Sequence, residues 1–582
     1  MDRQIIRVRS KEGMHRVTVE PTDDVFALRS KAARQPSGAD PLDPSGVSFA
    51  ELGIKHGDML YAQLLSKDAM SEVSKGKQPA TITTATTEED APMPTVKAAA
   101  AANTAAKDPL DEELERLDGR IPQPRDPRLC HHTKGVCTYC MPLEPYDEKY
   151  RESKNIKHLS FHAYLKKLKA AANQASAKQF SKWHGIHARP LTMPDYRVKP
   201  NCPNGHAPWP KSICSRCQPN AVTLKRQEFR MVDHVEFSSQ MIIDRFLDAW
   251  RLSGLQRFGW LYGRYERYDA VPLGIKAVVE AIYEPRQTGD ALWVEVAGVE
   301  DPDYEGDCRA DDVAAACGLV RVGMIWTDLT NDSLGGVICK RHVKSFFMSA
   351  QECQFAAAIQ RRYEYTTDQS SSGVFGSRNP QRQIEVNAYQ VSNEAMAMSE
   401  ADLIEPSVNP SMLRVKPEAP GRYIPDVFYS RTNEYGAQES GSAKPCFPVE
   451  YWLVTLTHGA PTNPSPLFND RHAFPIEHRP LRREDAAELH HHLLPVLRSS
   501  DPAAIHALLA NFHVLLSISN LAILSKDELA WIGQWIRAGP VDAASIATLQ
   551  AMPGWQTLIA LLNEGWTVAV SPLHLPQRNA HA

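Results

Sequence analysis

The sequence predicts a multidomain protein of the α+β class. Two compact clusters of cysteine and histidine lie in the first half of the chain, and strand-like and helix-like segments alternate after them. Between residues 66 and 107 the composition shifts to Ala, Thr, Pro, Glu and Lys, which is typical of a flexible linker. With 582 residues, the chain is long enough for three or four domains with apolar cores.

The N-terminal segment is expected to form a small β-grasp domain. Residues 4–9 and 17–20 have the pattern of two short strands, and Lys11-Glu12-Gly13 supplies the turn between them. A helix is expected over residues 21–28, and residues 52–62 give a turn and a further strand. Hairpin, helix, turn and strand within about sixty residues fit a ubiquitin-like module, with an unrelated small α+β domain as the alternative.

Two clusters share one arrangement of candidate metal ligands, with spacings Cys-x-His-x4-Cys-x2-Cys and Cys-x3-His-x7-Cys-x2-Cys. Each Cys-x2-Cys turn can direct two thiolates at one tetrahedral centre, and the earlier Cys and His complete the set. Four protein ligands leave no open position, so we expect two structural zinc ions and no catalytic one. The expected ligands are Cys130, His132, Cys137 and Cys140 in the first cluster and Cys202, His206, Cys214 and Cys217 in the second. His131 adjoins His132, and the sequence leaves open which of the two ligates.

Other uses of these cysteines fit less well. Residues 1–10 never build the apolar core of a signal peptide, which favours a reducing compartment over one that promotes disulfides. Iron–sulfur clusters usually take four thiolates, whereas each cluster offers three with a histidine. Zinc therefore remains the metal ion that both clusters are expected to bind.

A basic segment, residues 149–189, contains ten Lys or Arg and one acid, Glu152. Aromatic residues lie between the charges, which is one signature of RNA binding. Residues 161–168 also place apolar side chains at helical spacing, so the charged face of an ordinary helix explains the pattern as well. The net charge of −4 argues against a dedicated nucleic-acid protein. RNA binding is kept as an alternative function.

The remaining chain has the pattern of an α+β domain followed by helices. Helices are expected over residues 242–252, 311–317 and 350–360, and strands over residues 258–263, 278–283 and 320–326. Residues 503–524 are apolar enough to suggest a membrane span. However, His506, Asn511, His513 and Asn520 interrupt that run and would be costly in lipid. A buried helix in an all-α C-terminal domain is expected instead, without direct membrane insertion.

Several runs of residues resemble the nuclear protein localization protein 4 family, in the fungal-like form without a C-terminal zinc finger. These runs are residues 204–210, 214–219, 258–264, 323–329, 346–353, 389–393, 425–429 and 448–451. The last cysteine is Cys446, so the four-cysteine finger that ends some members is absent. The resemblance divides the chain into a ubiquitin-like (UBX-like) domain at 1–65, a linker at 66–107, tandem zinc fingers at 108–225, an MPN (JAMM-like) domain at 226–445 and a mainly helical domain at 446–582.

The resemblance implies a substrate-recruiting adaptor. Members bind polyubiquitin chains, of the linkage that marks proteins for the proteasome, and deliver the attached proteins to a hexameric AAA ATPase of the valosin-containing-protein type. The implied partner is ubiquitin fusion degradation protein 1, and the implied processes include ER-associated degradation. The implied locations are cytoplasm and nucleus, with peripheral residence at the ER and nuclear envelope through partners. The residues that contact ubiquitin are not identified by the sequence.

The MPN resemblance raises the question of catalysis, because active members are zinc isopeptidases. Their metal site uses His-x-His, a later Ser-x2-Asp and an upstream Glu base. Matching that motif places Trp326 and Asp328 at the histidines, Ser349 and Glu352 at the later element, and Arg257 near the base. An indole has no free nitrogen lone pair, and a guanidinium cannot accept a proton at working pH. We therefore expect a degenerate metal site and no enzyme, with an active isopeptidase as the alternative.

Overall fold

The structure is a computed structural model with two compact units, Met1–Ala102 and Asn103–Ala582, which are considered separately. It describes residues 4–10, 13–19, 59–61, 108–124, 137, 140–178, 193–200, 202, 205–296, 298, 308–330, 341–342, 345–363, 372–378, 384–432, 436–469, 474–479, 486–499 and 501–563. The expected helix at 21–28, the linker at 66–107 and the end of the basic segment lie outside these residues.

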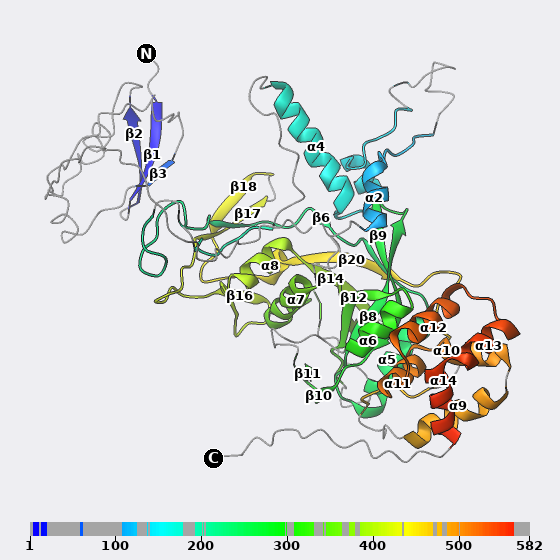
Figure 1. Cartoon of the computed structure of the whole chain (residues 1–582). Coiled ribbons are helices and arrows are strands. Elements are labelled where there is room, and N and C mark those ends of the chain that lie inside the picture. The colour runs from blue at the N-terminus through cyan, green and yellow to red at the C-terminus, as the bar shows by residue number, and fades with distance from the viewer. Residues whose placement is uncertain are drawn as a thin grey trace, which may run out of the picture. The chain divides into compact units, whose positions relative to one another are not determined.

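The first unit contains a sheet in the order β2-β1-β3 (Figure 1). Strands β1 (Gln4–Ser10) and β2 (Gly13–Val19) form an antiparallel hairpin, and β3 (Met59–Tyr61) pairs with β1 in parallel. The expected hairpin and final strand are thus confirmed, although β2 begins earlier than the sequence suggested. A parallel strand beside the first strand of a hairpin requires a crossover connection between them.

A closed barrel is the centre of the second unit, with strand order β12-β13-β14-β20-β7-β9-β8 (Figure 1). Pairing is antiparallel between β8 and β9, and parallel where β7 meets β9 and β20. The strands span His234–Phe237 (β7), Phe258–Tyr268 (β8), Gly274–Tyr283 (β9), Val320–Thr327 (β12), Ser372–Arg378 (β13), Ile384–Val391 (β14) and Leu453–Gly459 (β20).

Strand β8 contributes to a different core on each of its faces. Phe258 and Trp260 belong to the core shared with the C-terminal helices, whereas Leu261 belongs to the core under helix α5 (Gln240–Ser253). This follows from the two-residue period of a strand. Helix α5 begins at the N-cap Ser239, which accepts a hydrogen bond from the Met241 amide, and ends at Gly254 in a left-handed conformation. Its buried apolar face contributes roughly 1.5 to 3 kcal/mol per large side chain.

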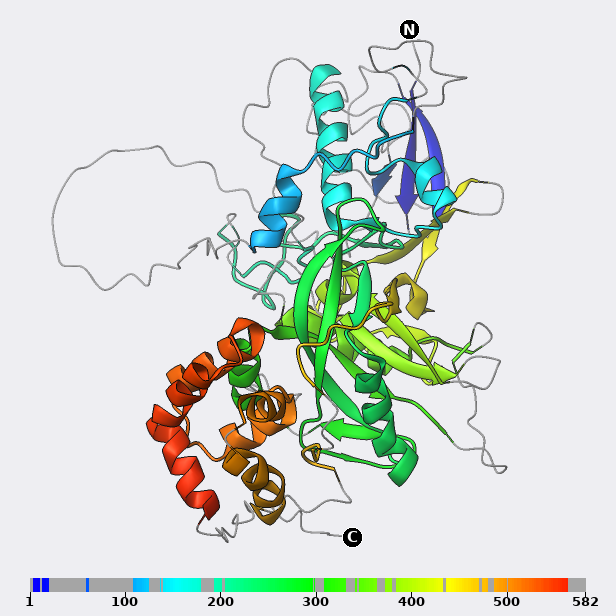
Figure 2. The same cartoon turned by 90° about the vertical axis from the view of Figure 1, so that its right-hand side faces the viewer.

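Helices gather beside the barrel and complete the larger core (Figure 2). Their packing is close: a Cβ added at Gly533 in α12 would lie 2.2 Å from the Ala316 carbonyl oxygen in α6. The helices span Cys308–Ala316 (α6), Ala350–Arg362 (α7), Asn393–Glu400 (α8), Ala486–Ser499 (α9), Pro502–Leu509 (α10), Phe512–Asn520 (α11), Lys526–Ala538 (α12), Ala543–Ala551 (α13) and Pro553–Asn563 (α14).

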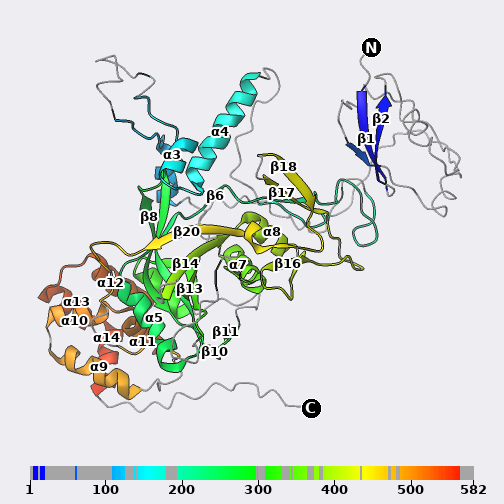
Figure 3. The same cartoon turned by 180° about the vertical axis from the view of Figure 1, so that it is seen from behind.

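Smaller elements surround the barrel. Helices α2 (Pro109–Arg116) and α4 (Phe161–Lys178) lie near the end where β8 and β9 extend (Figure 3). There, Leu114 of α2 packs against Leu273 and Ile275. The other elements are α3 (Glu148–Ser153), β4 (Leu159–Ser160), β5 (Val222–Leu224), β6 (Phe229–Arg230), β10 (Gln287–Gly289), β11 (Val294–Val296), β15 (Ile404–Pro406), β16 (Met412–Val415), β17 (Val427–Thr432), β18 (Gln438–Ser442), β19 (Cys446–Pro448) and the 3-10 helix η2 (Val449–Tyr451).

Two expectations about the C-terminal region need correction. Residues 446–459 do not belong to the helical part, because β19 pairs with β16 and β20 is a barrel strand. The helix expected over 503–524 is instead two helices, α10 and α11, since the chain bends by 81° between them. Within the described ranges, no single helix is both long and apolar enough to cross a bilayer. Only α10 and α11, taken together, reach that length and apolarity.

The barrel provides a test at Gly263, where the register of β8 and β9 shifts. A Cβ at this position would lie 1.9 Å from the Val278 carbonyl oxygen, so two paired backbones must separate to accept it. We expect Gly263→Ala to lower the free energy of unfolding by about 3 kcal/mol, measured by denaturant titration. The control is Gly459→Ala in β20, whose added Cβ would meet nothing closer than 3.7 Å. Equal destabilisation by the two variants would contradict the prediction.

Candidate functional site

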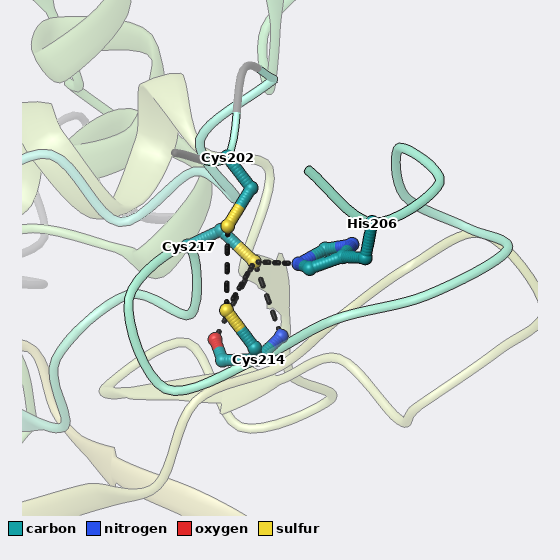
Figure 4. Close-up of side chains that lie close together, drawn as sticks. All are labelled: Cys202, His206, Cys214 and Cys217. Atoms are coloured by element: carbon teal, nitrogen blue, oxygen red, sulfur yellow. Dashed lines mark hydrogen bonds between the residues drawn. The ribbon is translucent and has the colours of Figure 1, made fainter. Parts of the chain in front are cut away.

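The second cysteine–histidine cluster has the dimensions of a tetrahedral metal centre (Figure 4). The ligand atoms of Cys202, His206, Cys214 and Cys217 all lie within 4.8 Å of one another. Cys202 Sγ is 3.3 Å from Cys214 Sγ, and Cys217 Sγ is 3.4 Å from His206 Nε2. At ordinary zinc–ligand distances, tetrahedral neighbours are separated by about 3.5 to 3.8 Å. Three thiolates and one imidazole in this arrangement fit a closed structural zinc site.

The local backbone holds these ligands in place. The Cys217 amide donates to the Cys214 carbonyl (3.1 Å), which closes a turn, and the Cys214 amide donates to Cys217 Sγ (3.1 Å). Gly205, with φ of 69°, makes the bend between Cys202 and His206. A side chain at this position would be strained by that backbone conformation.

Hydrogen bonds shift the pKa values of two of the ligands in opposite directions. The Arg216 backbone amide and then the Cys202 side chain lower the pKa of Cys214 to about 6, so its thiolate forms near neutral pH. The Ala207 carbonyl, followed by the sulfurs of Cys214 and Cys217, raises the pKa of His206 to about 9. The proton that this imidazole holds in the metal-free state must leave when a metal binds.

The first cluster repeats the turn of the second. The Cys140 amide donates to the Cys137 carbonyl (3.1 Å), and the Cys137 amide donates to Cys140 Sγ (3.3 Å). The two sulfurs are 3.6 Å apart, close enough for one ion to bind both. The other expected ligands, Cys130 and His132 with its neighbour His131, lie outside the described residues. A second zinc at this position stays a prediction.

The second cluster is attached to the body of the unit on two sides. On the chain that leads to it, Tyr196 donates to Glu394 of α8 (2.6 Å). Beyond His206, Trp209 donates from Nε1 to the Gly421 carbonyl (3.3 Å) and packs edge-on against Tyr423. These contacts connect the metal centre to residues 394–423 in the central part of the chain.

A groove of about 1020 Å³ lies beside the barrel, bounded by the β10–β11 hairpin, the end of β12 and α7. Two large apolar side chains at the hairpin tip, Leu292 and Trp293, line it and are 73% and 50% exposed. Trp326 and Phe355 add apolar side chains to the lining, and Asp328, Ser349 and Glu352 add polar ones. We call the part of the lining that these three polar residues form the polar end of the groove. The groove thus combines exposed apolar area with a polar end.

Four of the five residues that the sequence assigned to a degenerate metal site line this groove. They are Trp326, Asp328, Ser349 and Glu352. Ser349 and Glu352 form a capping box at the start of α7: the Glu352 amide donates to Ser349 Oγ (3.2 Å), and the Ser349 amide donates to Glu352 Oε2 (2.8 Å). Both side chains therefore contribute to the helix terminus.

Arg257 does not lie with the other four, and its expected place must be corrected. Its side chain is buried on the opposite face of the strand, where Nε donates to Glu284 (2.9 Å). Glu284 also accepts from Arg479 (2.5 Å) in the segment that leads to α9. The motif match was displaced by one position along the strand. Successive residues of a strand point to opposite faces, so the match selected a residue on the face away from the groove.

Gln256 is the residue that faces the groove at this position, and the sequence analysis missed it. Its Oε1 accepts from Thr327 Oγ1 (2.7 Å), and its Nε2 donates to the Leu329 carbonyl (2.6 Å). Gln256, Phe258 and Trp260 are two residues apart from one another, so an extended chain places them on the same face. This spacing was the signal in the sequence that could have identified Gln256. An amide side chain does not act as a general base at neutral pH.

Arg341 is the second missed residue, and it links Asp328 and Glu352, two of the three acids that line the groove. Nε donates to Asp328 Oδ2 (2.7 Å), while Nη1 and Nη2 donate to the two oxygens of Glu352 (2.9 and 2.5 Å). Nη1 also donates to the Phe347 carbonyl (2.9 Å). Burial opposes the charged form of Arg341, but Glu352 and Asp328 outweigh it and raise the pKa of the guanidinium above its ordinary value.

These residues do not supply what metal-assisted hydrolysis needs. A catalytic zinc site requires three protein ligands and an open position for water. At the polar end of the groove, the two carboxylates of Asp328 and Glu352 already bind a guanidinium, and the indole of Trp326 offers no lone pair. The arrangement suits a binding surface.

The chain is similar to proteins that share one name. The model of the NPL4 family matches residues 257–563, and the model of that family's zinc-binding region matches residues 105–254, which include both clusters. A Schizosaccharomyces pombe protein named Nuclear protein localization protein 4 is 40% identical, over 96% of this chain and 99% of its own. Proteins of that name from Saccharomyces cerevisiae and Kluyveromyces lactis are 39% and 38% identical, each over 96% of this chain and 100% of their own.

The metal centre provides a test at Cys217, the most buried ligand of the second cluster. We expect Cys217→Ser to remove one of about two bound zinc ions and to expose residues 193–220 to protease, because a closed site contributes most of the stability of such a lobe. Zinc content by mass spectrometry and limited proteolysis measure the two effects. The control is Cys446→Ser, outside both clusters. Unchanged zinc content in Cys217→Ser would contradict the assignment.

Proposed function

Because the chain belongs to the NPL4 family, we propose that it is a non-catalytic adaptor, which binds polyubiquitinated proteins and delivers them to a hexameric AAA ATPase of the valosin-containing-protein type. The ATPase would then unfold or extract them for proteasomal degradation, including ER-associated degradation. One observation carries the proposal: the groove has an apolar rim for binding, and a guanidinium lies between the two acids at its polar end. Such a groove can hold a polypeptide without cleaving it.

The groove has the chemistry expected of a surface for ubiquitin. Leu292 and Trp293 present exposed apolar area at its rim, and Trp is strongly enriched among residues that dominate binding energy. Among the described strands, β11 pairs with β10 alone, so a bound segment could extend this small sheet. Asp328 and Glu352 add carboxylate oxygens to the lining.

The other parts of the chain suit a multivalent contact with the ATPase. We assign the first unit as a ubiquitin-like domain, because its hairpin and parallel third strand match that topology. We assign the two clusters as structural zinc fingers that rest on the ATPase ring, and the barrel as an inactive MPN domain. A tethered domain and two zinc fingers convert several weak contacts into stable residence, since each bound contact raises the local concentration of the next.

The proposed partners and locations follow from family membership. Ubiquitin fusion degradation protein 1 would complete the complex as a heterodimer, and the bound chains would have the proteasome-targeting linkage. The name of the relatives supports a nuclear association, to which we add the cytoplasm and, through partners, the surface of the ER and nuclear envelope.

RNA binding by the basic segment has less support. Tyr164 of α4 stacks on Phe229 (ring centroids 4.6 Å apart), and Phe161 is buried, so these aromatic rings pack inward and do not offer a platform for bases. Lys167 forms an ion pair with Glu228 (2.6 Å). This part of α4 therefore has the contacts of an ordinary amphipathic helix.

Isopeptidase activity can be tested directly. We expect the full-length protein, incubated with ubiquitin chains and added zinc, to leave the chains intact, because Asp328 and Glu352 bind Arg341 and the described residues of the groove offer no triad of metal ligands. Chain length is measured on gels, with and without a chelator. Shortened chains that disappear on chelation would refute the assignment of a non-catalytic adaptor.

The groove can be tested at its rim. We expect Leu292→Ser combined with Trp293→Ser to weaken binding of ubiquitin chains about tenfold or more, measured by fluorescence anisotropy, because truncating an aromatic anchor typically costs 2 kcal/mol or more. The matched control is Leu252→Ser, since Leu252 is 75% exposed on α5 and does not line the groove. Equal affinity of the rim variant and the control would move the ubiquitin site elsewhere.

A further inference from the structure

The side chain of Arg341 is more deeply buried than the two acids that it binds, Asp328 and Glu352. Its side chain is only 4% exposed, whereas those of Asp328 and Glu352 are 17% and 25% exposed. The acids line the groove, but the guanidinium is covered by them and by Phe346, whose ring centroid is 5.5 Å from its central carbon. Arg341 is thus placed to act on the groove through its neighbours.

One guanidinium joins two segments that are separate in sequence, the end of β12 and the start of α7. Asp328 follows the last residue of β12, Phe347 lies before α7, and Glu352 is in the first turn of α7. The three acceptors converge on one planar group, which matches the fixed fork of donors in arginine. Lysine has a single ammonium group and cannot reproduce these angles.

Without this cation, the two acids would oppose each other. Each is partly buried, and two carboxylates that share such a site repel unless a positive charge compensates them. Glu352 has a second task, because its Oε2 accepts the Ser349 amide at the N-terminus of α7 (2.8 Å). Movement of Glu352 would therefore disturb the helix start as well as the groove.

We propose that Arg341 is a tethered cation that positions the polar end of the groove, and that its removal leaves a site for a free guanidinium ion. Arg341 is a positioning residue, since it acts through Asp328 and Glu352. The consequence for ubiquitin rests on the proposed function, whereas the consequence for stability and for guanidinium binding is independent of it.

The first experiment uses chemical rescue in the full-length protein. We expect Arg341→Ala to lower the thermal midpoint by roughly 5 °C, and about 10 mM guanidinium chloride to restore at least half of the loss, because a ligand of the folded state stabilises it by mass action. Sodium chloride at the same concentration is expected to restore nothing. The control is Arg361→Ala, which removes a more exposed ion pair with Glu400 at the other end of α7 (2.8 Å) and should show no rescue.

Replacing Arg341 by an uncharged residue with a long side chain separates the effect of its charge from the effect of its shape. Arg341→Met removes the guanidinium that Asp328 and Glu352 share, so adding Asp328→Asn and Glu352→Gln to it should recover at least half of the lost midpoint. The proposal is overturned if Arg341→Ala melts with the wild type, or if guanidinium stabilises it no more than Arg361→Ala. It is also overturned if the triple variant melts no higher than Arg341→Met alone.

Binding of ubiquitin chains gives a third measurement. We expect Arg341→Ala to bind chains about tenfold more weakly, with recovery in guanidinium, because the polar end loses its fixed geometry. If the wild type binds no chains, the proposed function fails, while the melting experiments still decide the role of Arg341. If Arg341→Ala binds chains as tightly as the wild type, the positioning role is overturned.

Discussion

The first part of strand β8, Phe258–Gly263, is buried on both faces, and this constraint determines where the chemical groups beside it lie. Phe258 and Trp260 point into one core and Leu261 into the other, so this part of the strand leaves neither face for solvent. The same alternation continues into the residues before the strand. Gln256 consequently faces the groove, while Arg257 is directed into a second buried site, where it meets Glu284. Two adjacent polar residues thus have unrelated roles.

Local patterns were sufficient for several of the helices and strands, but they did not predict which strands pair over long distances in the sequence. The helix expected over 242–252 is α5, and the one over 350–360 is α7, each within two residues at both ends, because apolar spacing and capping residues act locally. Strand β20 was missed because its partners, β7 and β14, lie far away in the sequence. Pairing across such distances leaves no local signal.

The candidate sites show the same difference between local and distant information. The Cys214–Cys217 turn is a local motif, and its ligands meet as expected. The motif match at Trp326, Asp328, Ser349 and Glu352 also brought together residues that share the groove. Arg341 belongs to no motif: it is 13 residues after Asp328 and 11 before Glu352, and only the folded chain shows that its charge lies between them.

Both kinds of site solve one electrostatic problem, the burial of several anionic groups close together. In the second cysteine–histidine cluster, three thiolates converge and a divalent ion would offset most of their charge, so we expect the stability of that lobe to depend on metal supply and pH. In the groove, two carboxylates converge and a covalently attached guanidinium offsets half of their charge without an ion from solution. A tethered cation cannot exchange or bind water for hydrolysis, and it holds its place at all pH values below the very high pKa of arginine. The guanidinium thus fixes the relative positions of two carboxylates without a metal, and under the proposed function such a surface would hold a polypeptide without cleaving it.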